Sequence, residues 1–161
     1  RFTYMAEPLI SWYSQDNTLD LAANGGWKIG TINAGDTSPQ LGVLLWNNRG
    51  GTSAVSDMND CTLTTVDTQG GSNSPVVTGK WVSTKVVSMS EVNFTAIGGN
   101  QSTKKSKASG QEDGTITGAV NDGTKENSKA NFAECILQAT PPLNAPAGNF
   151  NFNIRVSYTF T

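Results

Sequence analysis

The side chains that most often carry catalysis are scarce in this sequence. There is no histidine, which excludes Ser-His-Asp and Cys-His catalytic sites and every histidine metal ligand. The sequence also lacks a phosphate-binding loop, a dinucleotide fingerprint and a CxxC pair. We therefore expect a protein that is not an enzyme and that holds neither a metal nor a cofactor.

The acidic side chains that come nearest to a catalytic or metal-binding pattern surround one cysteine. Asp57, Asp60 and Asp67 cluster loosely around Cys61. Paired carboxylates could serve a glycosidase, and residues 57–60 could offer oxygen ligands to calcium. Neither spacing matches a known loop pattern, so we interpret this stretch as a solvated turn.

The two cysteines, Cys61 and Cys135, predict one disulfide in an exported protein. Such a bridge would stabilise the fold by about 2–4 kcal/mol, mostly through the unfolded state. Two buried free thiols are the alternative interpretation.

Tryptophans and lysines offer two further kinds of binding residue. A tryptophan on the surface suits stacking against a sugar ring, whereas a buried one belongs to the core. The four tryptophans are Trp12, Trp27, Trp46 and Trp81. A lysine group at Lys104, Lys105 and Lys107 reads as a solvated loop or as a site for acidic glycans or phospholipid.

Composition narrows the class of protein further. Charged residues make up 15% of the chain and the formal net charge is −2, so a nucleic-acid partner is not implied. The chain is rich in Gly, Thr, Ser and Asn, as secreted β-proteins are. No apolar run approaches the roughly 18 residues of a membrane-spanning helix. The start at Arg1, without a signal-peptide pattern, suggests a processed protein or a trimmed one.

The elements that must position these residues are short strands separated by Gly-rich turns. Apolar and alternating runs predict strands at 27–32, 41–46, 61–66, 91–97 and 132–140, with a weak one at 115–120. Residues 76–88 predict either one bulged strand or a hairpin. Residues 98–129 are otherwise polar and low in complexity. About eight to nine strands and no amphipathic helix indicate a single all-β domain over residues 1–161, a β-sandwich.

The strongest pattern lies in the last thirteen residues, where every even position is apolar and every odd one is polar or charged. Strand side chains alternate between faces, so one face of this strand is apolar and the other wet. Gly148 and the Pro-rich run before it mark the start of the strand. The apolar positions are Phe150, Phe152, Ile154, Val156, Tyr158 and Phe160.

This terminus resembles that of bacterial pilus subunits assembled by the chaperone–usher pathway. Those proteins carry alternating apolar residues, a Gly about fourteen positions from the end and a penultimate aromatic residue. Here Gly148 holds the fourteenth position from Thr161, and the penultimate residue is Phe160 where Tyr is usual. Their single disulfide commonly joins early strands, so the spacing of Cys61 and Cys135 departs from the best-known type.

The resemblance implies an immunoglobulin-like β-sandwich that lacks one strand and is completed by a donor strand. Gly148, the six alternating apolar residues and Thr161 would then border the assembly groove, and the carboxylate of Thr161 would be the chaperone anchor. The implied partners are neighbouring fimbrial subunits, a periplasmic chaperone, an outer-membrane usher and a host glycan or protein receptor. The implied location is the bacterial cell surface, reached through the periplasm.

Residues 1–13 have two interpretations within this family. Their even positions are also apolar, so they could be the donor-strand arm that completes a neighbouring subunit, or an ordinary first strand. Such arms usually include a Gly, and the first one here is Gly25.

Two other functions fit the same sequence. The subunit could itself be adhesive, with residues 98–129 as the place to look for receptor contacts. Alternatively, the chain could be a self-contained secreted sandwich, such as a carbohydrate-binding module, with no role in a pilus.

Overall fold

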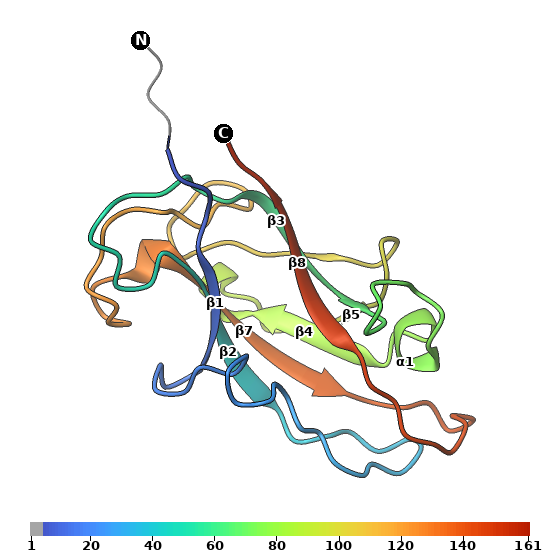
Figure 1. The fold of residues 1–161 in the computed structure, drawn as a ribbon. Helices are drawn as coiled ribbons and strands as arrows, with labels where there is room; N and C mark the ends of the chain where they lie inside the picture. Colours follow the sequence, from blue (N-terminus) through green and yellow to red (C-terminus); the bar gives the residue numbers. More distant parts are fainter. Residues whose placement is uncertain (1–4) are drawn as a thin grey trace.

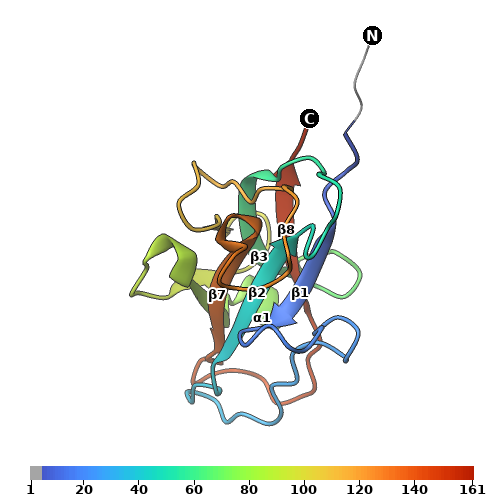
Figure 2. The ribbon, with the colours of Figure 1, turned by 90° about the vertical axis from the view of Figure 1, so that its left-hand side faces the viewer.

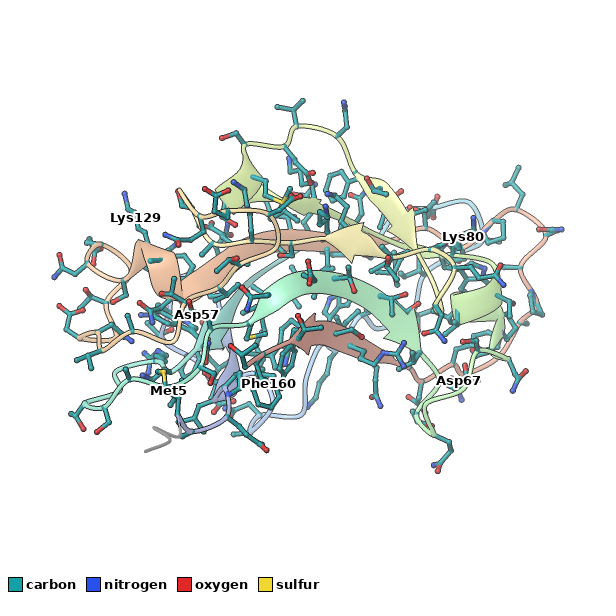
Figure 3. All side chains as sticks on the ribbon, turned by 90° about the horizontal axis from the view of Figure 1, so that it is seen from above. Met5, Asp57, Asp67, Lys80, Lys129 and Phe160 are labelled. Atoms are coloured by element: carbon teal, nitrogen blue, oxygen red, sulfur yellow. The ribbon has the colours of Figure 1, made fainter. Side chains whose placement is uncertain are left out.

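Two antiparallel sheets face each other in the computed structural model, which describes residues 5–161 (Figure 1). The first sheet has the strand order β1-β2-β7-β4-β5 and the second has the order β6-β3-β8. Figure 3 shows the two layers and the side chains between them. Strands take up 32% of the chain and helices 6%, which confirms the predicted all-β sandwich.

The described strands are eight in number and all short. They are β1 (Ile10–Ser14), β2 (Leu41–Asn47), β3 (Asn59–Val66), β4 (Val82–Val86), β5 (Thr95–Ile97), β6 (Lys104–Lys105), β7 (Phe132–Ala139) and β8 (Asn153–Thr159). The helical turns are α1 (Pro75–Thr78), η1 (Val87–Met89) and η2 (Lys129–Asn131). Among residues 5–161, no helix has the length and apolar character needed to cross a membrane.

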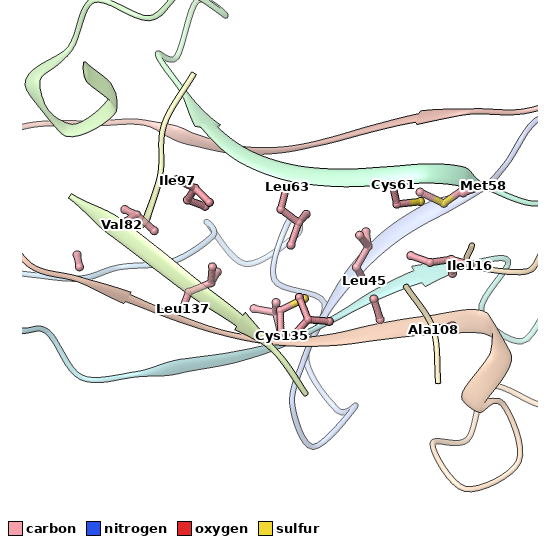
Figure 4. Packing of buried hydrophobic residues seen from close by; sticks show 14 of the residues in the cluster. Leu45, Met58, Cys61, Leu63, Val82, Ile97, Ala108, Ile116, Cys135 and Leu137 are labelled. Atoms are coloured by element: carbon pink, nitrogen blue, oxygen red, sulfur yellow. The ribbon is translucent and has the colours of Figure 1, made fainter. Parts of the chain in front are cut away.

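The core lies between the sheets and is built from alternate residues of the central strands. Val43 and Leu45 of β2, Leu63 of β3 and Leu137 of β7 all point into it and are almost completely buried (Figure 4). A second, smaller cluster lies on the outer face of the first sheet, where Trp46 packs on Phe132 with ring centroids 4.8 Å apart. Strand β2 is therefore apolar on both faces, which explains its continuous apolar run.

Some predicted strands are absent or only partly formed in the structure, and one of them, residues 115–120, is reduced to an isolated bridge between Ile116 and Met58. Within the predicted stretch 76–88, Val76 and Val77 belong to the helical turn α1, and only residues 82–86 form a strand. Pro75 occupies the start of this turn, where a missing N–H costs nothing. Residues 27–32 form no regular element, with φ of 80° at Gly30, and they pair with no strand of the described chain.

The first described residues and the C-terminus lie at the same end of the sandwich (Figures 1 and 2). Met5, Asp57 and Phe160 mark this end in Figure 3, and Asp67 and Lys80 mark the other. Ser56 joins the two ends of the chain: its N–H donates to the Ala6 carbonyl at 2.9 Å, and its hydroxyl donates to the Thr161 carbonyl at 2.8 Å.

Candidate functional site

A groove of about 1650 Å³ opens along one side of the sandwich. One of its walls is β8, the edge strand of the smaller sheet. The other is formed by β1, β2 and the segment from residue 22 to residue 34, which we call the strap. The floor is the core itself, reached at Val43, Leu137 and Val76. This open side of the sandwich therefore runs along the core; its floor is almost completely buried, and the apolar surface left exposed belongs to the half-buried side chains of the walls.

Strand β8 turns its apolar face toward this groove. The predicted alternation is present: its even positions pack against the core cluster, whereas odd positions such as Asn153, Ser157 and Thr159 are exposed. None of the even positions is fully buried, however, and Phe160 is 43% exposed. An amphipathic strand whose apolar face stays half exposed lacks a covering partner.

The backbone of β8 is also incompletely paired. It forms hydrogen bonds with β3 on one side, from Asn59–Thr159 to Val66–Asn153, and has no neighbouring strand within residues 5–161 on the other. A seven-residue free edge presents a row of N–H and carbonyl groups ready for another strand.

The strap faces β8 across the groove, and its residues 27–32 also lack backbone hydrogen-bond partners. Trp27, Ile29 and Ile32 are half buried and line the groove, while Lys28 and Thr31 are exposed. In the described chain, no backbone group from Trp27 to Ile32 has a hydrogen-bond partner. The strap thus has the amphipathic pattern of a strand beside an empty pairing position, although Gly30, with φ of 80°, interrupts the strand conformation at its centre.

Aromatic contacts hold the two walls together. Trp27 meets Phe152 edge-on, with centroids 6.2 Å apart, and Trp81 meets Phe150 in the same manner at 5.3 Å. Trp12 of β1 also lines the groove. Three of the four tryptophans proposed as glycan-stacking residues therefore gather in this one place.

The fourth tryptophan does not fit the glycan-stacking prediction. Trp46 is 0% exposed beneath Phe132, Tyr13 and Arg49, so it cannot stack on a sugar. It lies on a strand that is covered on both faces, a position that a single apolar run does not distinguish from a one-sided strand.

The predicted disulfide between Cys61 and Cys135 is absent. Both residues are buried free thiols, Cys61 on β3 and Cys135 on β7, so they project from opposite sheets (Figure 4). Burial raises the pKa of each thiol to about 12, with a further contribution from the Asp60 charge at Cys61.

The polar span 98–129 is anchored rather than loose. Ala108 and Ile116 are fully buried, and Ser106 donates its N–H to the Cys61 carbonyl at 2.9 Å. The Asn47 amide donates to the carbonyls of Ser56 and Ile116, at 3.0 and 3.2 Å.

Buried asparagines at one end of the sandwich hold this span in place. The amide of Asn131 donates to the carbonyls of Asn47, Thr117 and Ala119. Asn48 adds a similar set of contacts to Gly118 and Ala119. Sequence reasoning missed these residues, because asparagine is usually a surface or turn residue.

The remaining charged candidates have structural partners. The lysine group is engaged: Lys104 pairs with Glu91 at 2.5 Å and Lys105 with Asp113 at 3.0 Å, while Lys107 donates to the Gln111 carbonyl. These contacts leave no free lysine cluster for an anion, and the solvated-loop interpretation is wrong as well, because Lys104 and Lys105 form strand β6 and the Lys104 side chain is only 12% exposed.

The three aspartates also serve local structure. Asp57 accepts the N–H of Gly118 at 2.9 Å, and Asp67 accepts two backbone N–H groups of the following turn. Asp60 accepts the hydroxyl of Thr159 at 3.2 Å. No group of three potential metal ligands occurs in residues 5–161.

The N-terminal segment is a first strand over part of its length. Residues 10–14 form β1 and pair with β2 within the same chain, from Ile10–Asn47 to Ser14–Val43. Residues 5–9 form no strand, although Ala6 and Leu9 are hydrogen bonded to Ser56 and Asn48. The beginning of the predicted donor arm, residues 1–4, lies outside the described residues.

Comparison with known proteins adds little to this description. No family model matches the chain, and no curated protein does. One solved structure resembles it, a family 123 glycoside hydrolase from Clostridium perfringens, with 15% identity and a TM-score of 0.39. The match covers 96% of this chain and 25% of that one. A likeness of this size carries no functional argument.

Proposed function

We propose that this chain is a fimbrial subunit that polymerises by donor-strand complementation and contributes to bacterial adhesion to host surfaces. The observation that carries the proposal is the open groove between β8 and the strap. An incomplete sandwich has an exposed apolar interior and unpaired edges, and both are satisfied when an extended strand from another chain enters.

The incoming strand would supply the backbone hydrogen bonds and the apolar cover that each wall lacks. On one side it would pair with the free edge of β8, and on the other with residues 27–32 of the strap. Its inward side chains would cover half-buried wall residues such as Trp27, Phe152 and Ile154. The periplasmic chaperone would fill the groove first, and the donor strand of a neighbouring subunit would replace it during assembly at the usher and export to the surface.

A peptide experiment tests strand insertion. The probe is a peptide of about twelve residues that alternates valine with threonine and carries a polar solubilising tag. We expect it to bind, as measured by calorimetry, and to raise the Tm, because it covers apolar area and pairs two edges. A scrambled peptide of the same composition is the control.

Matched variants locate the binding to the groove. Phe152→Gln removes an inward aromatic side chain and is expected to weaken peptide binding by about tenfold or more. Asn151→Gln changes the neighbouring outward position and should leave binding unchanged. Equal binding by both variants would place the peptide elsewhere.

Expression in a periplasm tests the fimbrial role. With a matching chaperone, we expect a one-to-one complex; alone, the chain should be degraded or polymerise. A stable monomer with reversible unfolding and no peptide binding would overturn the proposal.

The gathering of Trp12, Trp27 and Trp81 in the groove favours one alternative, a secreted carbohydrate-binding sandwich with no pilus role. That function predicts quenching of tryptophan fluorescence by oligosaccharides, without any effect of the alternating peptide.

A further inference from the structure

The charges along the groove are of one sign. Of the described residues that line it, two are charged, and both are basic: Lys28 on the strap and Arg155 on β8. No aspartate or glutamate lines the groove within residues 5–161. This is unusual for a chain whose formal net charge is −2.

The two basic side chains lie on opposite walls, near the same level of the groove. The contact between Trp27 and Phe152 places Lys28 close to the level of Phe152. Arg155 is three residues further along β8, a distance of about 10 Å at the usual rise of a strand. Both belong to outward positions, because their sequence neighbours Trp27, Ile154 and Val156 pack against the core.

Lys28 has free hydrogen-bonding capacity, whereas the Arg155 guanidinium is directed toward Asn100, over the outer face of β3. Lys28 forms no ion pair in the described chain. Arg155 donates one guanidinium N–H to Asn100, while its Nε is buried without a partner. Lys104, Lys105 and Lys125, by contrast, each pair with a carboxylate.

We propose that the strand entering this groove carries aspartate or glutamate on its outward face, where a carboxylate contacts Lys28 and Arg155 adds positive charge from the outer face of β8. This inference rests on the strand-binding function proposed above and specifies the chemistry of the partner: apolar residues inward and acidic residues outward. Opposite charges at a rim speed association and select the partner and its register more than they add affinity.

Three peptides test the proposal. Each alternates valine with threonine as above, and they differ only at two central outward positions, which are both aspartate, both asparagine or both lysine. We expect the aspartate peptide to bind about 3-fold to 10-fold more tightly than the asparagine peptide, and the lysine peptide to bind most weakly. The difference should shrink as salt rises, because exposed charges are screened.

Variants of this chain assign the effect to particular side chains. In Lys28→Gln, an exposed substitution that leaves folding intact, the aspartate and asparagine peptides are expected to approach the same Kd. Arg155→Gln should act in the same direction. Lys85→Gln, which changes a lysine that lies over Phe94 away from the groove, should retain the full difference.

The outcomes distinguish the charge preference from the strand-binding function on which it rests. Equal Kd values for the three peptides would overturn the charge preference while leaving strand binding in place. Tightest binding of the lysine peptide would also overturn it. Failure of all three peptides to bind would overturn strand binding, and the charge preference with it.

Discussion

The two long sides of the sandwich differ in their edge strands: on one side these are short and joined by the chain, and on the other they are longer and not paired with each other. On one side the edge strands are β5 and β6, which have three and two residues, and the chain crosses between the sheets there. Gly99 donates its N–H to the Thr65 carbonyl and accepts the Thr64 hydroxyl, so the crossing is tied to both its neighbours. This is the closed side.

On the other side the edge strands are β1 and β8, with five and seven residues, and no described segment pairs across the gap. The strap lies there without backbone partners. Proteins usually shorten or cover an edge to prevent unwanted pairing. The chain does this on its closed side, so the long uncovered edges of the open side are best explained as a binding surface.

The largest expected difference in the free energy of unfolding is between isoleucine-to-alanine variants on the two sides. Ile97 is 0% exposed on the closed side, and Ile97→Ala should lower the free energy of unfolding by about 2–5 kcal/mol. Ile154 on β8 is half buried, so Ile154→Ala should cost about 1 kcal/mol in the free protein. Denaturant unfolding measures both, and equal losses would show that the open side is already packed.

The buried amide network should be nearly as sensitive. Asn47→Ala leaves the Leu9 N–H and the carbonyls of Ser56 and Ile116 without their partner, so we expect a loss of about 1–3 kcal/mol. Asn144→Ala, an exposed control, should change stability by less than about 0.5 kcal/mol. An Asn47→Ala variant with an unchanged free energy of unfolding would show that water can replace these hydrogen bonds at this end of the sandwich.

The two buried thiols should make the stability of the fold depend on pH. Because burial raises the pKa of Cys61 and Cys135 from 9.0 to about 12, the folded state keeps both protons in a range where the unfolded state loses them. Stability should therefore fall as pH rises from about 9 to about 12. The Cys61→Ala, Cys135→Ala double variant should show a shallower fall by denaturant titration.

Thiol labelling checks the same residues at pH 8. We expect no reaction in the folded protein and two reactive thiols after unfolding. Absence of reactive thiols in the unfolded, non-reduced protein would show that the disulfide forms after all.

The smallest effect is expected at a loop that belongs to neither side. The Asn127 amide and the N–H and hydroxyl of Thr124 hold the pKa of Asp122 well below its usual range. Its contribution to stability is therefore present above pH 3.8 and is lost as pH falls through the lowered pKa. A carbon-detected NMR titration should find this carboxylate still ionised at about pH 3; ordinary titration would contradict the hydrogen-bond pattern.

The central strands of the core could be predicted from the sequence, because the pattern that indicates each one lies within its own residues. Residues 41–46, 61–66 and 132–140 have the apolar runs or alternation of buried strands, and each became a strand with nearly those bounds. The even positions at the C-terminus were likewise predicted to face inward; those from Phe150 to Tyr158 do, whereas Phe160 is 43% exposed.

The open side could be predicted only in part, because pairing depends on distant segments. Residues 27–32 have a strand pattern, yet nothing local reveals that their pairing partner is missing. The separation of Cys61 and Cys135 onto opposite sheets is equally non-local. Gly25, near the start of the strap, and Gly35, directly after its end, both have φ near +85°; they indicate turns there but not the position of the strap beside β8.

Amide hydrogen exchange on the free protein, repeated with the alternating peptide, tests the open side most directly. We predict rapid exchange for residues 27–32 and for the unpaired amides of β8 in the free protein, and strong protection of both after the peptide binds. Amides of the closed side should not change. Protection of the strap in the free protein, or bound peptide that leaves both walls exchanging rapidly, would contradict the assignment of this groove as a strand-binding site.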